Sequence, residues 1–82
     1  MTTTHINQNV TVSSIGFGRS GNAYPRRMEF GGCTYNFVDA GIKTVVRKGE
    51  RRIADIFTVS DGQREFSLRK AAGSWTLLAI HG

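Results

Sequence analysis

Arginine and lysine side chains gather in stretches that could bind a polyanion. The densest stretch runs from Arg47 to Arg52, a charged turn between two apolar runs, and a second one is the pair Arg26 and Arg27, with Arg19 a short distance upstream. Guanidinium groups pair with phosphate oxygens through two parallel hydrogen bonds, so both stretches are typical of a polyanion contact. The alternative is that these charges are solvated and keep a small protein soluble, and both interpretations stay open.

Recognition of nucleic acid also requires exposed aromatic rings, because unpaired bases stack on them. Most aromatic residues of this chain fall on the predicted core face of a strand, and Phe17 and Tyr24 remain as possible stacking platforms. We therefore expect DNA or RNA as the partner, bound with little sequence selectivity. The predicted nucleic-acid-binding residues are Arg19, Tyr24, Arg26, Arg27, Arg47, Lys48, Arg51 and Arg52.

The segment from Gly16 to Gly21 matches the letters of the dinucleotide-binding motif G-x-G-x-x-G. That motif works at the start of a helix within a βαβ unit. Here Pro25 follows closely and the next segment alternates as a strand, so no helix can open and a dinucleotide site is excluded. A phosphate held by the backbone N–H groups of this loop and a plain connection between strands remain as alternatives.

Catalytic and metal-binding groups are sparse. His5 and His81 lie near the two ends of the sequence, Cys33 is the single cysteine, and no pair has the spacing of a zinc site. No histidine is expected within a folded run, where it could activate a serine. We therefore expect a protein that is not an enzyme and that has no metal and no cofactor.

Length and composition are typical of a single small soluble domain. The chain has 82 residues and a formal net charge of +5. The first nine residues do not resemble a signal peptide, and no apolar run is long enough to cross a bilayer. With one cysteine and no disulfide framework, the expected location is the cytoplasm, without membrane attachment.

A β-hairpin centred on Gly31-Gly32 is the clearest structural signal. Glycines accept the positive φ angles of a two-residue turn. The turn pairs Phe30 with Cys33 and Met28 with Tyr35. Strand alternation then directs five side chains to the core face: Met28, Phe30, Cys33, Tyr35 and Phe37.

Two further hairpins are predicted downstream. Asp61-Gly62 is expected to form a two-residue turn that pairs Phe57 with Phe66. Residues 70–73 are expected to form a four-residue loop that pairs Leu68 with Trp75 and Phe66 with Leu77. The predicted fold is all-β: one antiparallel meander of about six strands, curled into a partly open SH3-like or OB-like barrel over residues 10–82, preceded by a flexible arm over residues 1–9.

From Pro25 the chain weakly resembles a family of small uncharacterised bacterial all-β domains. The matching features are a P-R-x-x-x-aromatic-x-G-x-x-Y hairpin, here Pro25 to Tyr35, followed by F-x-V, F-x-L and W-x-L strands at Phe57, Phe66 and Trp75. The resemblance covers about two thirds of the chain. It implies an all-β fold and a loose association with DNA metabolism, and it transfers no functional residue.

Two functions remain as alternatives. The first is a small non-catalytic binding module that contacts nucleic acid or another polyanion through its arginine-rich loops. The second is a protein–protein interaction module or accessory subunit, in which the partner is another protein or a second copy of the chain joined through an exposed strand edge.

Overall fold

The computed structural model describes residues 2–18, 21 and 23–82, and its regular structure is entirely β-strand in these residues. Seven antiparallel strands form one sheet with the order β3-β2-β1-β7-β6-β5-β4. The strands are β1 (Thr3–Phe17), β2 (Ala23–Phe30), β3 (Cys33–Asn36), β4 (Asp39–Lys48), β5 (Arg51–Ser60), β6 (Glu65–Ala71) and β7 (Ser74–His81). The predicted all-β antiparallel meander is confirmed, with one strand more than expected.

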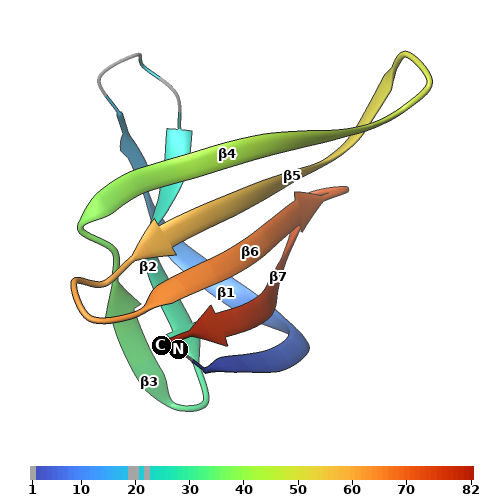
Figure 1. The fold of residues 1–82 in the computed structure, drawn as a ribbon. Helices are drawn as coiled ribbons and strands as arrows, with labels where there is room; N and C mark the ends of the chain where they lie inside the picture. Colours follow the sequence, from blue (N-terminus) through green and yellow to red (C-terminus); the bar gives the residue numbers. More distant parts are fainter. Residues whose placement is uncertain (1, 19–20, 22) are drawn as a thin grey trace.

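The sheet curls until β2 contacts β4 and β5, but it does not close into a barrel (Figure 1). Two successive residues between β3 and β4 connect the two halves of the curl. The backbone N–H of Phe37 donates to the carbonyl of Arg26 on β2 at 2.8 Å, and the N–H of Val38 donates to the carbonyl of Ser60 on β5 at 2.9 Å. The chain thus passes from one edge of the sheet to the other without a long connection.

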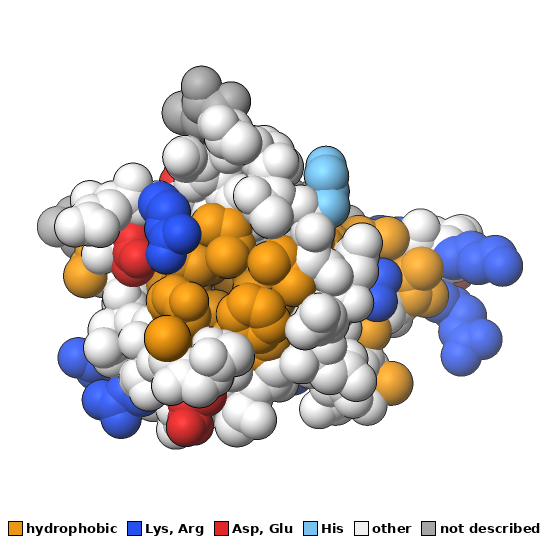
Figure 2. All heavy atoms as spheres, turned by 90° about the horizontal axis from the view of Figure 1, so that it is seen from below, with side chains coloured by type: hydrophobic (Ala, Val, Ile, Leu, Met, Phe, Trp, Pro, Cys, Tyr) orange, Lys and Arg blue, Asp and Glu red, His pale blue; other side chains and the backbone are white. Residues whose placement is uncertain are grey.

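The core fills the concave side of this curl. Its buried side chains come from β2, β5, β6 and β7 and from Phe37 beside β3. They are Met28, Phe37, Phe57, Val59, Phe66, Leu68 and Leu77. Partly buried hydrophobic side chains surround them, and Figure 2 shows hydrophobic side chains reaching the surface in the middle of one face.

The central hairpin has the predicted register, with Phe30 opposite Cys33 and Met28 opposite Tyr35. Gly31 and Gly32 both take positive φ angles, 60° and 77°. The expectation that Cys33 belongs to the core is wrong, because its side chain is exposed. Strand alternation predicted that its side chain points to the core face. Cys33 lies directly after the Gly31-Gly32 turn, at the end of the hairpin, where the core does not cover it.

The registers predicted for the two later hairpins are wrong: by two residues in the first, and in the second by two at Leu68 and by three at Phe66, which lies opposite Ile80 beyond a register shift. Phe57 lies opposite Leu68, and Leu68 lies opposite Leu77. The first turn is longer than predicted because the Asp61 carboxylate accepts hydrogen bonds from the backbone N–H groups of Gln63 and Arg64, at 2.9 and 2.8 Å. The second is shorter, because Ala72 takes a φ of 50° beside Gly73 and a two-residue turn forms. A shift of two preserves strand alternation, so the predicted core residues remain buried or partly buried.

The expected flexible arm over residues 1–9 is replaced by strand structure. Residues from Thr3 onward belong to β1, and Thr3 pairs with His81 on β7. The side chains take part as well, since Thr3 Oγ1 lies 3.0 Å from His81 Nδ1. The first and last strands are thus neighbours in the middle of the sheet.

The middle of β1 is irregular beside β2. The register against β2 shifts between Val12 and Ser14 and again between Ser14 and Ile15. The strand continues through both shifts to Phe17. β1 is therefore bulged near Ser14 and does not end there.

Candidate polyanion-binding cleft

A cleft of about 200 Å³ lies between the end of the β1–β2 pair and the neighbouring parts of β4 to β7. We call it the aromatic cleft because three ring side chains line it. It is lined by Ile15, Ala23, Tyr24, Lys43, Arg52, Asp55, Phe57, Lys70 and Trp75. Three of these side chains are cationic and one is a carboxylate, so the cleft is electropositive.

The strand register places a lysine over each of two rings. Lys43 lies directly opposite Phe57 in the β4–β5 ladder, and its Nζ is 5.9 Å from the ring centre. Lys70 lies directly opposite Trp75 in the β6–β7 ladder, and its Nζ is 5.4 Å from that ring centre. An ammonium group within about 6 Å of a ring centre is attracted by the π electrons. Both lysines are thereby held near the cleft although both are exposed.

The two rings also touch each other. The centres of Phe57 and Trp75 are 5.4 Å apart and their planes are inclined by 43°. Phe57 is buried, whereas Trp75 is only partly buried. The indole is therefore the ring that a ligand in the cleft can reach.

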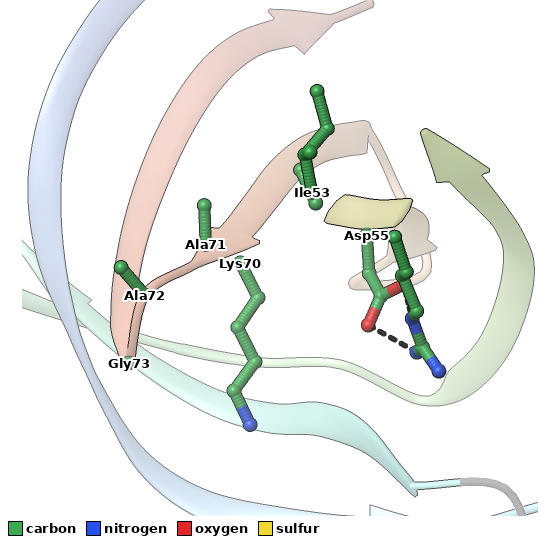
Figure 3. Close-up of a pocket in the computed structure, with 8 residues that line it drawn as sticks. Ile53, Asp55, Lys70, Ala71, Ala72 and Gly73 are labelled. Atoms are coloured by element: carbon green, nitrogen blue, oxygen red, sulfur yellow. Dashed lines mark hydrogen bonds and ion pairs between the residues drawn. The ribbon is translucent and has the colours of Figure 1, made fainter. Parts of the chain in front are cut away.

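Arg52 and Asp55 form an ion pair at the mouth of the cleft. Arg52 Nε donates to Asp55 Oδ1 at 2.9 Å, and its Nη2 donates to Oδ2 at 2.6 Å. The register against β4 shifts between Val46 and Arg47, which leaves Ile53 without an opposite residue in that ladder. This bulge directs Arg52 toward the side of Asp55. Figure 3 shows Asp55 and Lys70 pointing to one side of the sheet and Ile53 to the other.

The charges around Asp55 act on its ionisation. The pKa of its carboxyl is lower than the usual value, first because Arg52 donates hydrogen bonds to the carboxylate. Partial burial opposes this effect, and the positive charges of Arg52, Lys43 and Lys70 reinforce it. The two lysines and the arginine therefore act on one electrostatic site.

A second hollow of about 240 Å³, whose lining residues are drawn in Figure 3, shares part of its lining with the aromatic cleft. It extends over the β6–β7 turn, and Arg52, Asp55 and Lys70 line both hollows. We call these three residues the shared wall. Two hollows with one charged wall between them form a short groove.

Tyr24 forms the far side of the aromatic cleft, as a consequence of the glycine opposite it. Gly16 pairs with Tyr24 across β1 and β2. A Cβ atom on Gly16 would lie 2.8 Å from Cζ of the tyrosine ring, closer than real contacts allow. The missing side chain of Gly16 therefore makes room for the ring.

The structure brings some of the predicted site residues to the cleft and separates others from it. Tyr24 and Arg52 line the cleft. Arg47, Lys48 and Arg51 are exposed at the end of the β4–β5 hairpin, which projects from the body (Figure 1). We call Arg47 to Arg52 the basic arm, and Figure 2 shows basic side chains at the end of this projection.

The remaining predicted residues lie elsewhere. Arg26 and Arg27 are exposed on β2, where Arg27 Nε donates to Asn36 Oδ1 at 3.1 Å. Arg19 lies outside the described residues. The predicted set therefore includes two groups on different elements, the basic arm and the β2 arginines.

The sequence analysis missed Lys43, Lys70 and Trp75 as site residues. The two lysines were not included in the site, and Trp75 was placed in the core. Each lysine stands opposite an aromatic residue on the neighbouring strand. Correct registers for the β4–β5 and β6–β7 hairpins would have revealed both pairs.

His81 lies in a folded strand, contrary to the sequence-based expectation, and its Nε2 is 2.9 Å from Ser67 Oγ. Its other ring nitrogen contacts Thr3, so the histidine connects three strands. Neither Ser67 nor His81 lines either hollow of the groove. We interpret this network as structural.

Within residues 2–18, 21 and 23–82, no three His, Cys, Asp or Glu side chains are grouped in a way that could hold a metal ion. A helix with the length and apolar character of a membrane span does not occur in that part of the chain.

The comparisons with known proteins yield no relative. The chain matches no protein-family model, no curated protein sequence and no solved structure. The function is therefore inferred from the cleft itself.

Proposed function

We propose that this protein is a small non-catalytic binding module for nucleic acid or another polyanion. The observation that supports this most is the electropositive groove, in which Lys43, Arg52 and Lys70 surround the single carboxylate of Asp55. The groove continues at Arg52 into the basic arm, which adds Arg47, Lys48 and Arg51.

The physical basis of binding is the release of counterions. Each cation that pairs with a phosphate frees a counterion from the polymer, and the logarithm of the affinity falls with the logarithm of salt concentration by about 0.9 per contact for duplex DNA. Since phosphates are common to all sequences, such contacts favour binding with little sequence selectivity.

The test is a titration of labelled mixed-sequence DNA and RNA at salt concentrations from about 50 to 200 mM, the range over which such contacts lose most of their affinity. We expect binding at low salt and a steep decline as salt increases. The double variant Lys48→Gln/Arg51→Gln should bind more weakly and with a shallower salt dependence. Its control is Arg64→Gln/Arg69→Gln, which removes two positive charges outside the arm and the groove.

Absence of binding to DNA, RNA and heparin at low salt would contradict the proposal. Equal weakening by the two double variants would show that net charge matters and the basic arm does not.

The alternative function, a protein-interaction module or a homodimer, is favoured by one observation. Strand β4 is an edge of the sheet. Two apolar side chains there are exposed: Ile42 on the strand, at 68 %, and Val38 directly before it, at 71 %. An exposed edge with apolar side chains can accept a strand from another chain. Light scattering over a range of protein concentrations tests this, because a protein that stays monomeric contradicts the homodimer.

A further inference from the structure

We propose that the groove binds single-stranded nucleic acid, with one unpaired base in the aromatic cleft and the adjoining phosphate on the shared wall. This inference depends on the proposed function and narrows it to one class of ligand. Three features of the groove support it: its rings, the sharing of one wall by its two hollows, and the orientation of Arg52.

The rings of the aromatic cleft suit a flat ligand. Trp75 and Tyr24 are both partly buried and line the cleft from β7 and β2. Bases stack on such side chains whatever their sequence, because every base has a π face. In a duplex these faces are covered by neighbouring bases, so only an unpaired base can enter.

The two hollows, which share the wall of Arg52, Asp55 and Lys70, suit successive units of a polymer. The aromatic cleft holds about 200 Å³ and the adjoining hollow about 240 Å³. A chain of nucleotides can occupy both in succession and cross the shared wall with its backbone.

The shared wall presents donors that are already oriented. Asp55 occupies Nε and Nη2 of Arg52, while half of the arginine side-chain surface remains exposed. A guanidinium has five N–H donors, so further donors are available for a phosphate. Lys70 lies opposite Asp55 in the β5–β6 ladder, and its Nζ lies over the Trp75 ring, so it supplies a second cation at the place where a base would enter.

The chain contains one tryptophan, Trp75, so its fluorescence reports on the cleft directly. The experiment titrates the protein with single-stranded oligothymidine, a duplex of equal length, an abasic single strand of equal length and polyglutamate. We expect oligothymidine to quench Trp75, whereas the other three leave its emission nearly unchanged. The abasic strand should bind at least about tenfold more weakly than oligothymidine, as expected for the loss of one stacked base.

Two variants test the residues. Lys70→Gln should weaken oligothymidine binding, and Arg69→Gln should weaken it much less, because these neighbours point to opposite faces of β6 and only Lys70 lines the groove. Tyr24→Leu should weaken single-strand binding about tenfold while duplex binding changes less than twofold. Circular dichroism checks that each variant is folded, and Lys70→Gln provides the test if Tyr24→Leu does not fold.

The outcomes separate this inference from the proposed function. Equal affinity for single strand, duplex and abasic strand, without quenching, would overturn the inference and leave polyanion binding intact. Quenching by polyglutamate equal to that by oligothymidine would assign the groove to acidic protein segments. If the protein binds none of these polymers at low salt, and does not bind heparin either, both this inference and the proposed function are overturned.

Discussion

The side chains of Arg52 and Asp55 meet on one face of β5, with Nη2 and Oδ2 2.6 Å apart, although the two residues are three positions apart in the strand. In a regular strand, residues separated by three point to opposite faces. The bulge at Ile53 changes this alternation and brings the guanidinium to the carboxylate. The electropositive groove therefore depends on one irregular residue in the β4–β5 ladder.

The first prediction concerns the pH dependence of this ion pair. The pKa of Asp55 is lower in the folded protein than the value of about 3.9 expected in an unfolded chain. Its ionised form therefore stabilises the fold above about pH 4, and this stabilisation is lost as the pH falls through the lower, folded-state pKa. Asp55→Asn should have a lower free energy of unfolding than the parent protein at pH 7. This difference between the two proteins should vanish below the folded-state pKa of Asp55, where the carboxyl is protonated. Urea unfolding at a series of pH values measures it, and a difference that stays constant at all pH values would contradict the assignment.

The second prediction compares two glycines with nearly equal backbone angles. Gly41 has a φ of 62° and a Cβ there would lie 1.7 Å from the carbonyl oxygen of Thr58. Gly49 has a φ of 64° with no atom within 4 Å of such a Cβ. Gly49→Ala should cost about 1 to 2 kcal/mol for the left-handed conformation alone. Gly41→Ala should cost clearly more or prevent folding, as measured by denaturant unfolding. Equal costs would show that the contact with Thr58 has no effect.

The third prediction concerns Gly16 and Tyr24. Gly16→Ala should lower the free energy of unfolding by about 1 to 3 kcal/mol, because the new methyl group displaces the tyrosine ring. In the background Tyr24→Ala the same substitution should cost much less. A double-mutant cycle measures this coupling. Additive effects of the two substitutions would contradict a direct contact.

The fourth prediction concerns Cys33. Its exposed thiol should react with a disulfide reagent in the folded protein at a rate similar to that in the unfolded protein. Cys33→Ser should change the free energy of unfolding by less than about 0.5 kcal/mol, as is usual for surface positions. A thiol that reacts with the reagent only after the protein unfolds would show that Cys33 is buried in the core.

The sequence was sufficient for the fold class because strand alternation alone identifies the core face. An error of two residues in the register preserves that face, so Phe57, Phe66 and Leu68 were assigned to the core although their partners were wrong. The registers themselves depend on turn conformations, in particular the Asp61 side chain bonded to its own turn and the positive φ of Ala72. Neither conformation is evident from residue types.

The groove was less predictable, because the strands that form it are distant in the sequence. Tyr24 and Trp75 meet across the cleft only after β1 has paired with both β2 and β7. The polar residues 3–9 gave no sign of that pairing, since they have few apolar side chains with which to mark a buried face. Arg52 was correctly included, but its partner Asp55 became apparent only with the bulge.

The pairing of β1 with β7 also affects how the chain folds. The β2–β3, β4–β5 and β6–β7 hairpins can form from local sequence, but the centre of the sheet joins Thr3 to His81 and Val10 to Trp75. Contacts between residues so far apart require a large loop to close before they stabilise the structure, which slows folding. The rate-limiting step should therefore be the docking of β1 against β7, and the groove, whose walls come from both sides of that pair, should form last.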